Sequence, residues 1–336
     1  SEMCIRDRIV CIEMISKQQK PINSGFGAKS EPAAVMENID LSDKTVVVTG
    51  GYSGIGLETI RALKEAGARV VAPARRKDIA IKELDGIIDK DDVAEMDLAD
   101  PSSVQQFVDD FTEKVSSLDI LINNAGIMAC PEMRTSQGWE LQFAVNQIGH
   151  FVLTKGLLPL MQKANGARLV ALSSTGHKIS GIRWDDIHFK SSDYDKWAAY
   201  GQSKTAGSLL AVEVDKRMQD SGIRAFGVHP GGIMTPLQRH LETEEMVALG
   251  WMNEDGEPTE RVAKMFKSPT QGASTSLWAA TSPQLDDIGG VYCEDCDVAK
   301  RQDDSDKNAR FIGVADWAVD SEEASRLWEE TEKILN

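Results

Sequence analysis

The chain has few cysteines, and these few do not form a disulfide framework or a metal site. Five cysteines in 336 residues are too sparse for the disulfide-dense scaffolds of small secreted domains. Cys293 and Cys296 have CxxC spacing, but no second pair or nearby histidine completes a zinc site. The five histidines also lack metal-binding spacing. We therefore predict no metal and leave the role of the CxxC pair open.

Positive charge is also in short supply. The 37 Lys and Arg residues are outnumbered by 53 Asp and Glu residues, which gives a formal net charge of −16. Binding to nucleic acid or to an anionic membrane usually needs an excess of basic groups, so we expect neither as a partner. The segment Cys293–Asn336 holds 13 acidic and 6 basic residues, a local charge of −7. We interpret it as a solvated acidic surface.

Long apolar runs are missing as well. No run approaches the roughly 20 apolar residues that a membrane-spanning helix needs. The N-terminal residues contain no apolar segment typical of a signal peptide. We therefore expect a soluble, cytoplasmic protein with no membrane anchor.

The first 35 residues are predicted to lie outside the folded domain, as a disordered or artefactual arm. Residues Glu2–Arg8 resemble a translated sequencing adapter, so residues 1–8 are excluded from the fold prediction. Residues 17–30 are rich in Lys, Gln, Gly and Ser, which predicts disorder. A short helix is predicted over residues 32–38. On this view, deleting residues 1 to about 30 leaves the melting temperature nearly unchanged.

The sequence does contain a regular alternation of strands and helices. Apolar, β-branched runs predict strands over residues 44–49, 69–74, 92–96, 118–122, 168–172, 224–228 and 290–292. Helical periodicity predicts helices over residues 54–66, 101–117, 139–163 and 197–218. This alternation indicates βαβ units. We predict an α/β fold with a Rossmann-type doubly wound parallel sheet, as a single domain over residues 36–300, with residues 301–336 packed on it as a C-terminal extension.

A glycine-rich turn joins the first predicted strand to the first helix. Glycines leave room for the backbone to approach a phosphate, and the N-terminus of the next helix attracts its negative charge. Because the turn follows a strand and opens a helix, it predicts a dinucleotide site more strongly than an ordinary structural turn. The cofactor-binding residues predicted here are Gly50, Tyr52, Ser53, Gly54, Ile55 and Gly56.

The end of the second predicted strand favours NADP over NAD. Enzymes that bind NAD usually carry an acid at this place for the ribose 2′-hydroxyl. Here Ala74 is followed by Arg75, Arg76 and Lys77, and an arginine can bind a 2′-phosphate with charge-assisted hydrogen bonds. A solvated basic loop is the alternative. We predict NADPH as the cofactor, with Arg75 among the residues that bind it.

Tyr200 and Lys204 lie four residues apart in a predicted helix, so they share one face. A free tyrosine has a pKa near about 10, and a neighbouring cation lowers it. Ser174, after the fifth predicted strand, can hydrogen-bond a substrate oxygen. This set is suited to proton transfer alongside hydride transfer between a carbonyl and an alcohol.

Taken in order, these motifs resemble the short-chain dehydrogenase/reductase family. The resemblance covers about residues 40–300 and includes Asn123-Asn-Ala-Gly126 and Pro230-Gly231. The stretch Asn146-Gln-Ile-Gly-His150-Phe and the long interval from Ser174 to Tyr200 resemble the retinol-dehydrogenase and WW-domain-oxidoreductase branch.

The resemblance implies a role for each matching residue. The catalytic residues would be Asn146, Ser174, Tyr200 and Lys204, with Asn146 anchoring a water relay. Asp97 would meet the adenine, and the residues from Asn123 to Gly126 would support the central strand and the ribose. Thr235 would hold the nicotinamide carboxamide. Further residues implied in cofactor binding are Leu98, Asn124, Ala125, Gly126, Tyr200, Lys204, Pro230, Gly231 and Ile233.

Two long irregular segments, residues 175–199 and 231–269, follow the fifth and sixth predicted strands. Open α/β sheets bind ligands at this edge, and long loops often carry function. Their apolar residues predict a lid over a small hydrophobic carbonyl or alcohol substrate. The residues predicted to line this pocket or lid are Met128, Cys130, Ile182, Trp184, Met234, Leu237 and Trp251.

Two alternatives stay open beside an NADP-dependent carbonyl reductase. One is a retinol-like or protochlorophyllide-like reductase, and the other is a noncatalytic NADP-binding regulator. The complete set of Asn146, Ser174, Tyr200 and Lys204 argues against the regulator, which needs no proton-transfer residues. The sequence leaves the substrate, the reaction direction and the oligomeric state open, with a homodimer or homotetramer considered.

Overall fold

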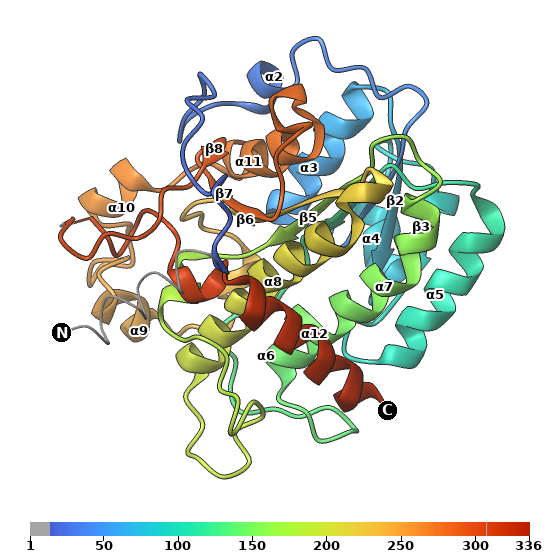
Figure 1. Cartoon of the computed structure of the whole chain (residues 1–336). Coiled ribbons are helices and arrows are strands. Elements are labelled where there is room, and N and C mark those ends of the chain that lie inside the picture. The colour runs from blue at the N-terminus through green and yellow to red at the C-terminus, as the bar shows by residue number, and fades with distance from the viewer. Residues whose placement is uncertain (1–13, 307) are drawn as a thin grey trace.

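The fold is built on one eight-stranded sheet (Figure 1). The computed structural model describes residues 14–306 and 308–336, so the adapter-like residues 2–8 lie outside the described residues. The strands are β1 (Thr45–Val48), β2 (Arg69–Ala74), β3 (Val93–Glu95), β4 (Ile120–Asn123), β5 (Arg168–Leu172), β6 (Arg224–His229), β7 (Val291–Glu294) and β8 (Asp297–Val298). Their order is β3-β2-β1-β4-β5-β6-β7-β8.

The sheet is parallel from β3 to β7, which confirms the predicted doubly wound fold. A parallel strand that is covered on both faces needs an apolar run, and Val46, Val47 and Val48 of β1 are fully buried. The strand order reverses between β1 and β4. Such a switch point opens a crevice at the carboxyl ends of the strands. The antiparallel edge strand β8 was not predicted.

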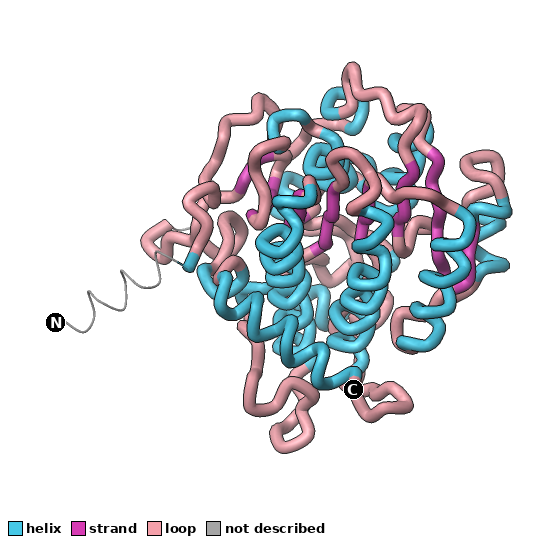
Figure 2. Tube along the Cα trace, turned by 45° about the vertical axis from the view of Figure 1, so that its right-hand side comes forward, coloured by secondary structure: helices cyan, strands magenta, loops and turns pink. Residues whose placement is uncertain are grey.

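Helices cover both faces of the sheet (Figures 1 and 2). One face carries α2 (Pro32–Val35), α3 (Gly54–Glu65), α4 (Lys77–Glu83) and α11 (Pro269–Thr281). The other face carries α5 (Pro101–Lys114), α7 (His150–Met161) and α8 (Lys196–Met218), and α12 (Ser321–Leu335) packs on α8. Two short helices, α9 (Thr243–Ala248) and α10 (Glu260–Met265), lie in the long segment after β6. Among the described residues, no helix is long and apolar enough to cross a membrane.

The helix predicted over residues 139–163 is interrupted. It consists of α6 (Leu141–Phe143), a π-helical turn over Ala144–Gly149, and α7. A Cβ at Gly149 would lie 2.2 Å from the carbonyl oxygen of Leu98, so this turn touches the backbone after β3. That contact is long-range, and helical periodicity alone does not reveal it. Single π-helical turns often lie at functional sites.

The N-terminal segment differs from the prediction of a disordered arm, because residues 14–30 pack along β7 and β8. The buried side chain of Gln19 donates to the carbonyl oxygens of Tyr292 and Ala299, at 3.0 and 2.7 Å, and accepts from the Tyr292 amide at 2.8 Å. The carboxylate of Asp297 accepts backbone amides of residues 22–24. Buried backbone groups need such partners, so the segment completes this edge of the sheet. The division of the chain at residues 35 and 300 stays a prediction.

We therefore expect Gln19→Ala to lower the free energy of unfolding by about 2 kcal/mol, because it leaves buried backbone groups without partners. The adjacent Gln18→Ala is the matched control. Its side chain donates to the Asp287 carbonyl at an exposed site and accepts a long bond of 3.4 Å from the Gly289 amide, so its cost should stay below about 1 kcal/mol. Urea unfolding followed by circular dichroism measures both variants. A Gln19→Ala midpoint equal to that of the unmodified protein would show that this segment contributes little to stability.

Candidate active site

The glycine-rich turn approaches the backbone after β4 more closely than a side chain allows. Gly50 has a φ of 63°, and a Cβ there would lie 2.9 Å from the Ala125 Cα. A Cβ at Gly56 would lie 2.3 Å from the Gly50 carbonyl oxygen. The Asn124 side chain donates to the carbonyl oxygens of Thr49 and Gly50, at 2.8 and 3.2 Å. The turn is thus fixed against residues 124–126, with the first residues of α3 at the crevice.

Two cavities lie next to each other along the crevice, with volumes of about 300 and 280 Å³. They share Gly50, Tyr52, Ala125, Gly126 and Arg239, so one elongated ligand can occupy both. The larger is also lined by the predicted residues Ser53, Gly54, Ile55, Gly56, Asn124, Ser174, Tyr200, Lys204, Pro230, Gly231, Ile233 and Thr235. The smaller is also lined by the predicted residues Arg75, Asp97 and Leu98, and by Ala74 and Cys130.

Arg239 and His240 line the smaller cavity but were not predicted as site residues. Both belong to the long segment after β6, which the sequence placed at the binding edge without indicating which side chains face it. Arg239 brings a second cation to a cavity that already contains Arg75. Arg239 and His240 belong to no recognisable sequence motif, so only the folded structure shows that they line the cavity.

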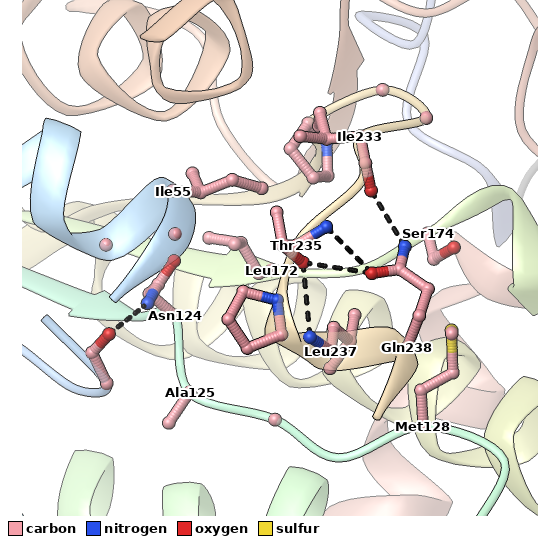
Figure 3. A pocket seen from close by; sticks show the side chains of 18 of the residues that line it. Ile55, Asn124, Ala125, Met128, Leu172, Ser174, Ile233, Thr235, Leu237 and Gln238 are labelled. Atoms are coloured by element: carbon pink, nitrogen blue, oxygen red, sulfur yellow. Dashed lines mark hydrogen bonds between the residues drawn. The ribbon is translucent and has the colours of Figure 1, made fainter. Parts of the chain in front are cut away.

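The loop after β6 closes over the glycine-rich turn (Figure 3). The Thr235 hydroxyl accepts from the Leu237 amide at 3.3 Å, and the Gln238 side chain accepts from the Thr235 amide at 2.8 Å. These reciprocal bonds form a capping box. A Cβ placed at Gly54 would lie 3.4 Å from the Thr235 Cβ. Thr235 therefore lies directly against the start of α3.

Tyr200, Ser174 and Lys204 meet at the inner end of the larger cavity. Burial raises the pKa of Tyr200 to about 12, and a hydrogen bond with the Ser174 side chain opposes this shift. Burial also lowers the pKa of Lys204 to about 8. The Lys204 ammonium donates to the Leu172 carbonyl at 3.2 Å and lies 5.6 Å from the centre of the Tyr200 ring. Burial is therefore the largest influence on the pKa of Tyr200, and the phenol is protonated at neutral pH, as a free tyrosine is.

Two residues with an expected role, Asn123 and Asn146, line neither cavity. The buried Asn123 side chain donates to the Thr154 hydroxyl at 2.9 Å, and Asn146 lies in the π-helical turn. The Asn146 side chain accepts from the Ile127 amide and donates to the Ser203 hydroxyl, both at 2.9 Å. Ser203 lies on α8 between Tyr200 and Lys204. Asn146 therefore joins the chain after β4 to the helix that carries the tyrosine and the lysine.

His150 connects this turn to the glycine-rich turn. The Thr49 hydroxyl accepts from the amides of Asn124 and Ala125, at 3.0 and 2.9 Å, and lies 2.9 Å from His150 Nε2. Since the hydroxyl oxygen already accepts two bonds, its proton is directed at Nε2. The His150 proton is then on Nδ1, which lies 3.2 Å from the Asn146 carbonyl. Burial lowers the pKa of His150 to about 4, consistent with a neutral ring.

His177 connects Ser174 to the C-terminal extension. Its Nε2 accepts from the Ala315 amide at 3.0 Å, so its proton is on Nδ1, which donates to the Ser174 carbonyl at 2.6 Å. Burial lowers the pKa of this ring to about 4. The Trp317 indole donates to the His177 carbonyl at 3.2 Å. The extension thus contacts the loop that carries Ser174 through one buried, neutral histidine.

A third cavity of about 780 Å³ opens from Tyr200 and Ser174. A wall of edge-to-face aromatic rings runs along it, with centroid separations of 6.3 Å for Tyr200–Trp197, 6.4 Å for Trp197–Trp251 and 6.0 Å for Trp251–Phe266. The predicted pocket residue Met128 also lines it. Glu245 of α9 accepts from the Trp197 indole at 3.1 Å and pairs with Lys196 at 2.6 Å. The segment after β6 is thereby anchored to α8 over the cavity.

The lid prediction is wrong for Ile182 and Trp184 of the segment after β5, whereas the same segment does line the third cavity, with Thr175, Gly176, Lys178, Ile179 and Trp197. The indole of Trp184 donates to the Glu323 carboxylate of α12 at 2.8 Å, and the Arg326 guanidinium lies 4.1 Å from its ring. Ile182 packs in the same apolar cluster as Leu327. These residues cover the C-terminal extension instead of the crevice. Leu237 and Trp251 do line the crevice, while Met234 lines none of the three cavities.

Replacement of His177 by Phe should lower kcat about tenfold, because Ser174 loses the bond that fixes its backbone. The dissociation constant for the dinucleotide should change less than about twofold, since His177 lines neither dinucleotide cavity. His188→Phe is the matched control, another buried histidine with a lowered pKa that bonds the Glu140 amide instead. It should cost stability and leave kcat within about twofold. If both variants lose stability and keep kcat, His177 has only a structural role.

The comparisons with known proteins agree with this geometry. A family profile described as short chain dehydrogenase matches residues 44–246. A protein of Streptomyces lividans named "probable oxidoreductase" is 41% identical over 87% of this chain and 97% of its own. Mouse retinol dehydrogenase 12 is 35% identical over 89% of this chain and 88% of its own.

Among solved structures, an uncharacterised protein from Mycobacterium paratuberculosis superposes with a TM-score of 0.66. It is 30% identical, and the match covers 89% of this chain and 96% of that one. Sequence profile, relatives and fold point to the same group of nicotinamide-dependent oxidoreductases. The chain belongs to the short-chain dehydrogenase/reductase family, in its retinol-dehydrogenase branch.

Proposed function

We propose that this protein is an NADP(H)-dependent oxidoreductase that interconverts a carbonyl and an alcohol on a small hydrophobic substrate. The observation that carries the proposal is the buried meeting of Tyr200, Ser174 and Lys204 where the crevice joins the aromatic-lined cavity. A regulator that only binds a dinucleotide does not need these three side chains close together. The name of the mouse relative, a retinol dehydrogenase, is consistent with an apolar substrate.

The residues of the crevice fit a dinucleotide. A side chain at Gly50 or Gly56 would collide with backbone, so both positions keep the turn open to a pyrophosphate. The two adjoining cavities suit a ligand with two nucleoside halves. When bound, the reduced nicotinamide supplies the hydride.

The chain itself would supply the proton and the orientation. Tyr200 is protonated at pH 7, as a free tyrosine is, so its hydroxyl can donate a proton to the oxygen of a carbonyl under reduction. The Ser174 hydroxyl would hold that same oxygen. Lys204, charged below a pKa of about 8, would stabilise the phenolate that remains. The aromatic wall would exclude water from the reacting atoms.

The proposed preference for NADPH depends on Ala74 and Arg75. Ala74 is buried at the end of β2, where an acid would repel a 2′-phosphate, and Arg75 is exposed beside it on the smaller cavity. Arg239 adds a second cation to the same cavity. A phosphate there would accept charge-assisted hydrogen bonds that a 2′-hydroxyl cannot match.

The unmodified protein should bind NADPH at least about tenfold more tightly than NADH, and Ala74→Asp with Arg75→Leu should reverse the order. Arg76→Leu is the matched control, because Arg76 is the next cation along the chain and does not line the cavity. Titration of nucleotide fluorescence gives both dissociation constants. Equal affinity of the unmodified protein for the two cofactors would defeat the assignment.

Tyr200→Phe should lose turnover by about 100-fold or more, the usual contribution of a general acid, while NADPH binding is retained. A broad screen of ketones, aldehydes and alcohols, followed by NADPH absorbance, supplies the substrate for this test. Tyr194→Phe is the control, a half-buried tyrosine whose hydroxyl bonds Glu140 and Cys130 instead. Near-normal turnover of Tyr200→Phe would remove the tyrosine from the mechanism.

A further inference from the structure

The mouth of the aromatic-lined cavity carries a cluster of cations on a strongly acidic protein. The basic residues that line the cavity are Lys29, Lys178, Arg261, Lys264, Lys267 and Arg310. Only two acidic residues, Glu294 and Asp295, line it as well. The chain as a whole has a net charge of −16, so this local excess of positive charge runs against its composition.

Half of these cations are offset within the protein. Lys267 pairs with Asp295 at 2.7 Å, and Lys264 pairs with Glu260 at 2.6 Å. Lys178 is partly buried and donates to the carbonyl oxygens of Ala309 and Ile312, both at 2.6 Å. The remaining acid, Glu294, lies near Lys178, but burial raises its pKa to about 7, so it is only partly ionised at neutral pH. The inner part of the cavity therefore carries little free charge compared with the mouth.

Lys29, Arg261 and Arg310 are the cations without a carboxylate partner in the described part of the chain. All three are exposed at the mouth. The guanidinium groups of Arg261 and Arg310 each lie 5.8 Å from the centre of the same ring, Phe311. Both arginines therefore lie next to Phe311, and a guanidinium binds an anionic group with charge-assisted hydrogen bonds.

The cavity thus has three zones. Ser174 and Tyr200 form its inner end, the rings of Trp197, Trp251 and Phe266 form a wall, and the cations lie at the mouth beside exposed Met265 and Phe311. A neutral apolar ligand would leave the two arginines without an anionic partner. An amphipathic ligand would use all three zones.

We propose that the preferred substrate is an amphipathic carbonyl or alcohol compound with an anionic group at the end of its apolar body that is remote from the reacting carbon. The proposal rests on the proposed oxidoreductase function and narrows its substrate class. Carboxylate and phosphate share the chemistry that Arg261 and Arg310 would recognise. The mouth selects the anionic end, and Tyr200 receives the carbonyl end.

The test compares linear aldehydes with the matching ω-carboxy aldehydes and ω-phosphoryl aldehydes, over a series of chain lengths, with NADPH as reductant. We expect kcat/KM to be about tenfold higher for an anionic aldehyde than for the neutral one, and added salt should reduce this advantage. The ratio of the two anionic aldehydes shows whether carboxylate or phosphate is preferred. Equal kcat/KM for neutral and anionic aldehydes would overturn the proposal.

The double variant Arg261→Gln/Arg310→Gln should lose the tenfold advantage while its kcat/KM for the neutral aldehyde stays unchanged. Lys264→Gln is the matched control, an exposed cation of the same mouth whose charge is already paired, and should keep the advantage. An advantage that survives in the double variant would contradict the assigned site. Turnover of none of the aldehydes or of the screened compounds would instead count against the oxidoreductase function itself.

A binding measurement separates recognition from turnover. Alkyl carboxylates should raise the melting temperature of the NADPH-bound protein more than alkyl alcohols of equal length, and only when Arg261 and Arg310 are present. If both kinds of compound act equally and the arginines instead promote binding to phosphatidylglycerol vesicles, the mouth is a membrane contact and the proposal fails.

Discussion

The Thr49 hydroxyl is the contact on which the crevice depends. By accepting two amides after β4 and donating to His150, it joins the end of β1, the end of β4 and the helix that follows. The hydrogen bonds of the sheet alone would allow these segments to separate at the switch point. Gly50 can lie close to Ala125 only if the segments are held together. Through Asn146 the same network reaches Ser203, so the glycine-rich turn and the Tyr200 helix form one connected unit.

The sheet and most of the candidate site could be predicted from the sequence because their signals are local. Buried parallel strands are apolar runs, and β2 and β5 have the predicted bounds. A glycine-rich turn and a Tyr/Lys pair can be recognised from residue type and spacing alone, without knowledge of the folded structure. Nearly all the predicted site residues line the two crevice cavities, although their roles stay proposals.

What failed depends on contacts between distant parts of the chain. The composition around Gln19 predicts a polar, disordered arm, but its hydrogen-bond partners, Tyr292 and Ala299, are near the opposite end of the sequence. Trp184 looked like a lid residue because it is apolar and follows a strand, yet its indole needed a hydrogen-bond partner and found it in Glu323.

The mouth of the large cavity is assembled from three segments: residues 28–29 near the N-terminus, the segment after β6, and residues 310–312 near the C-terminus. Each has its own attachment, since residues 14–30 are bonded to β7 and β8, α9 is bonded to α8, and Ala315 is bonded to His177. None of these attachments passes through the glycine-rich turn or Lys204. The attachment at Ala315 does lead through His177 to Ser174, so the C-terminal segment can change only where this contact is kept. Over evolutionary time, relatives can therefore exchange the N-terminal segment and alter the mouth while the residues at the bottom of the cavity stay in place.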